Sequence, residues 1–218
     1  MSTFLFNDAF REQLQENDHH WGEVIFLESV LRPGMVVIEG GANRGVTTVA
    51  TAKSVGNTGR VHAFEPVPEY FSMLQENISQ NDVQNVNPYN LALSDQSGGL
   101  VFYKHGEGSG ITLVADAEPI RVNAITIPEF LSMHRVPRVD FLNLDCEGSE
   151  LLIFRNAGDI LQKQGPQIFC EVHHEYLQDL GQSVEDIVQL LGSLAYTVKP
   201  IQVENLDAPS DFATCSHI

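Results

Sequence analysis

The stretch that most constrains the fold runs from residue 35 to residue 45 and reads MVVIEGGANRG. Its four apolar residues are too few for a helix and too continuous for a half-exposed strand, so they predict a buried parallel strand. Helical spacing resumes after the turn, which consists of an acid and three glycines around an asparagine: Glu39, Gly40, Gly41, Asn43 and Gly45. We therefore expect a strand, a glycine turn and a helix whose free N–H groups face a ligand.

The composition is that of a globular protein, with 218 residues, of which 43% are hydrophobic and 19% charged. This length suits one α/β domain, and we expect residues 1–32 to form an N-terminal helical extension and residues 33–218 to form the main domain. No run of about 18 apolar residues occurs, and the N-terminus lacks a basic segment followed by an apolar one. We expect a cytoplasmic protein with no membrane partner.

The charge balance and the cysteine content argue against nucleic-acid-binding, disulfide-rich and zinc-binding proteins. Acids outnumber bases 29 to 12, for a formal charge of -17. Nucleic acid is not expected as a partner, because neutralising phosphates requires a basic surface. The three cysteines, Cys146, Cys170 and Cys215, are odd in number and widely spaced. This pattern favours reduced thiols over a disulfide framework or a zinc site.

Strand-like and helix-like segments alternate along the chain. We predict helices within 4–31 and at 68–81, 127–133, 149–157 and 183–194, strands at 60–65, 86–93, 139–145 and 166–172, and strand segments within 196–203. Between 98 and 126 three short β runs (100–103, 111–114 and 120–126) predict an antiparallel insertion. The alternation is typical of a doubly wound, Rossmann-like α/β sheet with an antiparallel tail.

Acidic residues stand at the ends of several predicted strands: Glu39, Glu65, Asp145 and Glu171. In an open parallel sheet the carboxyl ends of the strands border the ligand crevice near the topological switch point, so the first three acids should converge there. Glu65 lies twenty positions after Gly45. At that distance from a glycine turn, an acid commonly accepts hydrogen bonds from ribose hydroxyls.

The glycines of the turn discriminate between cofactors. A dinucleotide fingerprint requires glycine at positions 40, 42 and 45, and this chain has Ala42 at the middle position, where the backbone would approach a pyrophosphate. The case for NAD as the cofactor is therefore weaker, although NAD remains an alternative. No Gly-x-x-x-x-Gly-Lys-Ser/Thr run occurs, which excludes a P-loop.

Four blocks follow one another along the chain: IEGGANRG, AFEPVPE, NLALSD and VDFLNLDCEGSE. Together they resemble the FkbM-type methyltransferases, a branch of the class I S-adenosylmethionine-dependent enzymes. The resemblance implies a seven-stranded, mostly parallel sheet and a methyltransferase domain over 33–218. It also implies roles: the segment from Glu39 to Gly45 would hold the methionine end of the cofactor, Glu65 with Pro66 the ribose, and Leu91 with Ala92 the adenine, while Asp145 and Glu147 would face the reaction centre.

Two positions depart from the family pattern. The family commonly has aspartate where this chain has Glu39, which lengthens the side chain by one methylene. It also commonly has lysine where this chain has Asn143, and an amide cannot form the ion pair that a lysine forms. A cofactor-binding protein whose catalytic activity has lapsed therefore remains an alternative, as does an NAD(P)-dependent oxidoreductase.

We expect methyl transfer to a hydroxyl of a small-molecule or sugar-like acceptor. S-adenosylmethionine is a sulfonium with a good leaving group, so in-line transfer needs positioning and a base for the acceptor proton. The candidates for that base are Asp145, His173 and His174. A divalent metal held by Asp145, Glu171 and His173 is an alternative, and from the sequence alone we favour the metal-free reaction.

Overall fold

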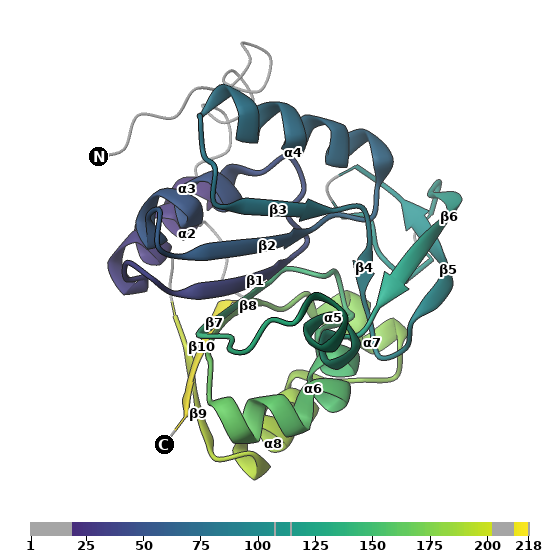
Figure 1. The fold of residues 1–218 in the computed structure, drawn as a ribbon. Coiled ribbons are helices and arrows are strands. Elements are labelled where there is room, and N and C mark those ends of the chain that lie inside the picture. Colours follow the sequence, from purple (N-terminus) through teal and green to yellow (C-terminus); the bar gives the residue numbers. More distant parts are fainter. Residues whose placement is uncertain (1–18, 107, 114, 202–211, 218) are drawn as a thin grey trace.

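The predicted strand at residues 35–39 is β1 (Val36–Gly40), and it lies inside a seven-stranded sheet of order β3-β2-β1-β7-β8-β10-β9 (Figure 1). The computed structural model describes residues 19–106, 108–113, 115–201 and 212–217. Strands β3, β2, β1, β7 and β8 run parallel, and β10 runs antiparallel to both of its neighbours. The other strands are β2 (Arg60–Phe64), β3 (Val86–Tyr89), β7 (Phe141–Leu144), β8 (Gln167–Glu171), β9 (Tyr196–Pro200) and β10 (Phe212–His217).

Helices cover both faces of this sheet, because neighbouring residues of a buried strand point to opposite sides. Val37 belongs to the apolar cluster formed with α2 (His19–Val30), α3 (Val46–Val55) and α4 (Pro68–Gln80). Ile38 belongs to the cluster on the opposite face. That cluster includes residues of α5 (Ile127–His134), α6 (Glu150–Gln164), α7 (His174–Asp179) and α8 (Val184–Ser193). The doubly wound fold class is thereby confirmed.

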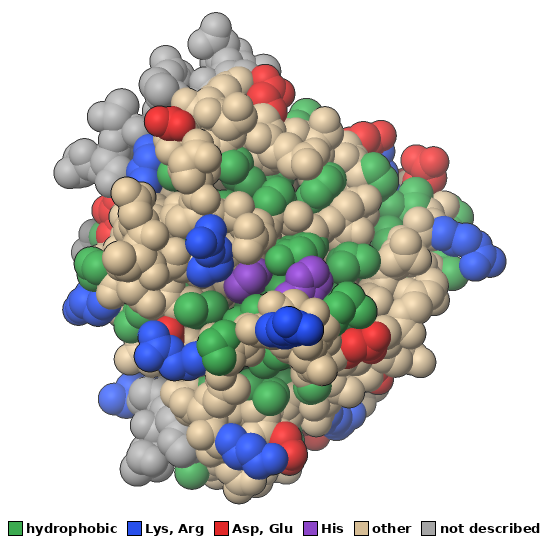
Figure 2. Space-filling model, viewed as in Figure 1, with side chains coloured by type: hydrophobic (Ala, Val, Ile, Leu, Met, Phe, Trp, Pro, Cys, Tyr) green, Lys and Arg blue, Asp and Glu red, His purple; other side chains and the backbone are tan. Residues whose placement is uncertain are grey.

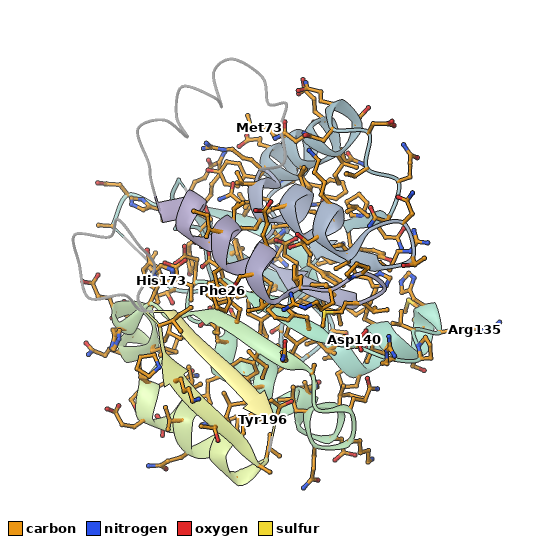
Figure 3. The ribbon with its side chains drawn as sticks, turned by 90° about the vertical axis from the view of Figure 1, so that its left-hand side faces the viewer. Phe26, Met73, Arg135, Asp140, His173 and Tyr196 are labelled. Carbon is orange, nitrogen blue, oxygen red and sulfur yellow. The ribbon has the colours of Figure 1, made fainter. Side chains whose placement is uncertain are left out.

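Helix α2 is the described part of the predicted N-terminal extension. Its Phe26 stacks on Phe169 of β8, with ring centroids 4.8 Å apart (both Phe26 and α2 can be followed in Figure 3). The helix thus packs on the sheet as part of the same core. The predicted helical positions before residue 19 lie outside the described residues, and the boundary at residue 32 stays a prediction.

A second, small sheet forms the predicted insertion. It consists of β4 (Ala92–Leu93), β6 (Glu118–Ile125) and β5 (Gly98–Lys104), in that order. Strands β5 and β6 are antiparallel, as predicted, whereas β4 and β6 are parallel. The predicted run at 111–114 is wrong as a strand over its described residues, 111–113: an isolated bridge joins the preceding Gly110 to Tyr103, and residue 114 lies outside the described part.

Three further boundaries differ from the prediction. The strand expected over 86–93 is interrupted at Asn90, whose side chain donates to the backbone oxygens of Glu65 and Pro66. The helix expected to end at residue 157 continues to Gln164 and is followed by Gly165 in the left-handed conformation. Strand β10 comes from the C-terminal tail, where the sequence pattern predicts no element.

The chain has a formal charge of -17. On the face that Figure 2 shows, both basic and acidic side chains lie at separate places among neutral and apolar atoms. Among the described residues, no helix combines the length and the apolar character that a membrane span requires.

Candidate active site

The glycine turn after β1 is built for close backbone approach. Gly41 has φ 78°, and a Cβ at this residue would lie 1.8 Å from the backbone oxygen of Asp145. The N–H groups of Gly41 and Ala42 both donate to the carbonyl of Phe64, at 3.1 and 2.9 Å. The turn is therefore fixed to β2 on one side and lies against the end of β7 on the other, as expected for a crevice at the switch point.

Helix α3 begins at this turn with an open N-terminus. Gly45 precedes it with φ 92°, and no side chain caps the first turn of the helix. Uncapped N–H groups at a helix start, together with the helix dipole, favour a carboxylate or phosphate group. The predicted strand, glycine turn and helix are therefore present, and the helix has an uncapped N-terminus.

Glu65 lies next to the turn and is tied to it. Its two carboxylate oxygens accept hydrogen bonds from the N–H groups of Asn43 (2.8 Å) and Val67 (2.7 Å). The residue is 4% exposed, and this burial raises the pKa of Glu65 to about 7 despite the two N–H donors. Each carboxylate oxygen has a further lone pair, so Glu65 can still accept hydrogen bonds from a ligand.

Glu39 lies beneath the turn, 1% exposed. Its Oε1 accepts hydrogen bonds from Thr47 (2.6 Å) and from Asn143 (3.1 Å), and burial raises its pKa. Asn143 therefore holds Glu39 by an amide hydrogen bond at the position where the family commonly has lysine. The buried Oε2 of Glu39 and the buried Oδ1 of Asn43 have no hydrogen-bond partner among the described residues. Asn43 lines a cleft, and its free acceptor suits a donor-only group such as an ammonium. Glu39, although predicted to contact the cofactor, lies in the second layer and is not part of the lining of either cleft.

Two clefts meet at the turn, and Gly41, Asn43 and Asp145 line both. The first has an empty volume of about 510 Å³ and a largely apolar wall, to which Phe64, Glu65, Pro66, Tyr70, Ala92, Leu93 and Phe102 contribute. The second, of about 530 Å³, is more polar and includes Glu23, Arg44, Thr47, Asn143, Phe169 and Glu171 in its lining. Both volumes include space that is open to solvent, so these are clefts and not enclosed cavities.

Acidic side chains surround one imidazole at the edge of the second cleft. Nε2 of His173 lies 3.3 Å from Oδ1 of Asp145, 3.3 Å from Oε2 of Glu147 and 3.7 Å from Oε1 of Glu171. We call these four residues the carboxylate–histidine cluster. They come from the end of β7, the turn that follows it, the end of β8 and the N-cap of α7.

Electrostatic interactions within the cluster determine which of its side chains carry a proton. Burial lowers the pKa of His173. The hydrogen bond to Asp145 and the charges of the three acids have the opposite and larger effect, and together they raise the pKa to about 10. Burial and the charge of Asp145 raise the pKa of Glu147 to about 9. At neutral pH the cluster on its own therefore holds an imidazolium, and His173 is a poor proton acceptor.

The structure brings most of the predicted site residues together. Gly40, Gly41, Asn43, Gly45 and Asp145 line the second cleft, and Glu65, Pro66 and Ala92 line the first. Leu91 differs: it packs against the core of the main sheet, and Leu93 lines the cleft instead. His173 lies in the cluster, whereas His174 is exposed on the first turn of α7.

Sequence reasoning missed Glu23. It lies on α2, is 7% exposed, lines the second cleft and forms a side-chain hydrogen bond with Glu171. Burial and the charge of Asp145 raise its pKa well above the usual range. No motif marks this residue as part of a site, because it reaches the site only through the packing of α2 on the sheet. An acid inside an otherwise apolar helix face is the only signal that the sequence offers.

The chain is similar to a curated methyltransferase and to solved structures. It is 26% identical over 153 residues to the hexuronic acid methyltransferase AglP of Haloferax volcanii, a match that covers 70% of this chain and 59% of AglP. The chain thus spans little more than half the length of that relative.

Two solved structures show the same fold. Methyltransferase FkbM from Methylobacillus flagellatus KT has a TM-score of 0.57 at 15% identity, over 89% of this chain and 50% of that one. Fibrillarin of Aeropyrum pernix, solved with natively bound S-adenosyl-L-methionine, has a TM-score of 0.51 at 16% identity, over 85% of this chain and 67% of that one. The sheet is therefore the Rossmann-like sheet of class I methyltransferases. The model of the methyltransferase FkbM domain matches residues 39–198, and the chain belongs to this family.

Proposed function

We propose that the chain binds S-adenosylmethionine at the glycine turn and transfers its methyl group to a hydroxyl of a small, sugar-like acceptor. The observation that carries this proposal is the junction of the two clefts: Asp145 lines both and lies beside the turn. A cofactor that spans the junction has its nucleoside in one cleft and its amino-acid end in the other, so its sulfonium lies near Asp145.

The residues fit the parts of this cofactor. The apolar cleft suits an adenine, and Glu65 has acceptor capacity for the ribose hydroxyls. The unpartnered Oδ1 of Asn43, which lines both clefts, suits the α-ammonium group. The uncapped N-terminus of α3 suits the α-carboxylate. The bound cofactor supplies an electrophilic methyl group on a positively charged sulfur.

Transfer needs the acceptor oxygen in line with the C–S bond. As the new C–O bond forms, the C–S bond breaks, its electron pair stays on sulfur, and the hydroxyl proton must leave. Of the predicted bases, Asp145 is best placed to take this proton, because His173 already carries one and His174 is exposed. The name of AglP, a hexuronic acid methyltransferase, supports a sugar-like acceptor.

Calorimetry with the demethylated cofactor, S-adenosylhomocysteine, tests the cofactor site. We expect micromolar binding by the wild type and binding about 10- to 100-fold weaker for Glu65→Ala, because charge-assisted hydrogen bonds contribute roughly 1.5–3 kcal/mol each. Glu76→Gln, at an exposed position of α4, is the matched control and should bind as the wild type does. Undiminished binding by Glu65→Ala, or binding of NADH instead, would contradict the assignment.

A panel of acceptors then tests the reaction. Uronic acids, neutral sugars and small alcohols are incubated with S-adenosylmethionine, and methylated products are detected by mass spectrometry. The proposal expects an O-methylated product from at least one uronic acid or sugar. Cofactor binding without transfer to any of them would favour the lapsed-activity alternative.

A further inference from the structure

The carboxylate–histidine cluster has the composition and spacing of a metal site. Three residues, Asp145, Glu171 and His173, each offer one ligand atom, and these atoms all lie within 4.8 Å of one another. The distances from Nε2 of His173 are 3.3 Å to Asp145 and 3.7 Å to Glu171. Two ligands at right angles around one Mg²⁺ or Mn²⁺ ion are about 3 Å apart. Small side-chain shifts would therefore bring all three atoms into coordination distance of one ion.

The backbone holds these ligands in place from three directions. Asp145 follows β7, and its N–H donates to the carbonyl of Gly40 at 3.0 Å. Glu171 is the last residue of β8, the neighbouring strand. His173 is the N-cap of α7, and its carbonyl accepts from Leu177. Ligands fixed on two strand ends and a helix start form a more rigid site than ligands on a long loop.

A second observation at the same place points to a cation. Glu147 is 8% exposed, and its buried Oε2 has no hydrogen-bond partner among the described residues. This oxygen lies 3.3 Å from Nε2 of His173, so it faces the cluster. The residue is held there in the left-handed conformation, at φ 51°. A buried carboxylate oxygen without a donor is costly unless a positive charge lies close to it. In the free protein the imidazolium of His173 supplies that charge, and a divalent cation bound at the cluster would supply it in place of the imidazole proton.

We propose that Asp145, Glu171 and His173 bind one divalent cation of the Mg²⁺ or Mn²⁺ type, and that this cation orients the acceptor hydroxyl for methylation. Carboxylate oxygens with a single imidazole suit hard cations of this kind, which keep several positions for water or substrate. The role in methylation rests on the proposed function, whereas the binding of the ion does not.

A bound cation would change the role of Asp145 and the route of the hydroxyl proton in the reaction. A hydroxyl that contacts a divalent cation loses its proton more readily. Asp145 would then serve as a ligand, and the hydroxyl proton would pass to water, while the C–O bond forms and the C–S bond breaks with its electron pair left on sulfur. Two neighbouring oxygens of a sugar acceptor could occupy the open positions, which fixes the acceptor in one orientation.

Binding of Mn²⁺ alone, followed by EPR of the unbound ion, tests the site without cofactor or acceptor. We expect one ion per chain, displaced by an excess of Mg²⁺. Asp145→Asn, Glu171→Gln and His173→Ala should each weaken binding at least 10-fold. Glu175→Gln, at an exposed acid two residues after His173, should bind as the wild type does. Circular dichroism checks that each variant is folded.

Several outcomes separate this proposal from the proposed function. Equal Mn²⁺ binding by the wild type and by all three folded variants would mean adventitious binding to surface acids, and would overturn the site. Methyl transfer that continues in excess EDTA would also overturn the role of the cation while leaving the proposed function intact. Tight, cluster-dependent Mn²⁺ binding without methylation of any hydroxyl would support the site and contradict the proposed function.

Discussion

Glu65 shows how one buried acid can make the stability of the fold depend on pH. Its ordinary pKa is 4.5, and burial raises the pKa to about 7 in the folded protein. Between these two values the folded protein holds a proton that the unfolded chain has released. The free energy of unfolding contributed by this group is therefore fully present below pH 4.5 and is lost as the pH rises through 7.

We expect this loss to be visible in a comparison of the wild type with Glu65→Gln, which cannot titrate. A pKa difference between 4.5 and about 7 corresponds to about 3 kcal/mol. Urea unfolding at about pH 5 and about pH 8 measures it: the stability difference between the two proteins should shift by that amount. Parallel stabilities across this range would mean that Glu65 ionises with its ordinary pKa.

Asn143 is a second residue whose contribution to stability can be measured by a single substitution. Its amide donates to Oε1 of the buried Glu39, so Asn143→Leu removes a donor and leaves the carboxylate with its threonine partners. We expect a loss of about 1–3 kcal/mol in the free energy of unfolding, measured by urea denaturation. Asn156→Ala removes an exposed amide that donates to the carbonyl of Asp95, and should cost far less. An equal cost for both variants would argue against a structural role for the Asn143–Glu39 bond.

The turn between β1 and α3 is the element on which the site depends. Gly41→Ala would put a Cβ 1.8 Å from the backbone oxygen of Asp145, at a φ of 78°. We expect a loss of about 3 kcal/mol or more in stability, and loss of S-adenosylhomocysteine binding by calorimetry. In Gly99→Ala, on β5, the added Cβ meets no atom within 4 Å, so this variant should behave as the wild type does. Normal cofactor binding by a folded Gly41→Ala protein would contradict this account of the turn.

The elements best predicted from the sequence are those with a local cause. The buried run before Glu39, the glycines after it and the cap at Ser183, which forms a full capping box, each determine their own structure. Strand β10 could not be assigned in this way, because a polar tail becomes a strand only between β8 and β9. The same holds for Glu23, which reaches the site through the packing of α2, and for the choice of His173 over His174, which the start of α7 decides.

At the scale of the whole molecule, charge is the dominant property. The formal charge is -17, and the face in Figure 2 has no basic patch. We expect no binding of a fluorescent single-stranded RNA in fluorescence anisotropy, even at low salt, where phosphate contacts are strongest. Salt-dependent RNA binding at micromolar protein would contradict the predicted exclusion of nucleic acid.

The order of the strands also bears on how the chain is made on the ribosome. Strand β1 pairs with β7, and Glu39 and Asn143, which are bonded across this pair, are 104 residues apart in the sequence. Closing a loop of this length is slow compared with local folding. During synthesis one edge of β1 therefore stays unpaired until β7 has emerged. Neither cleft has its Asp145 wall before that moment, so the two clefts are complete only after β7 has paired. We expect this half to depend on chaperones while it waits for β7.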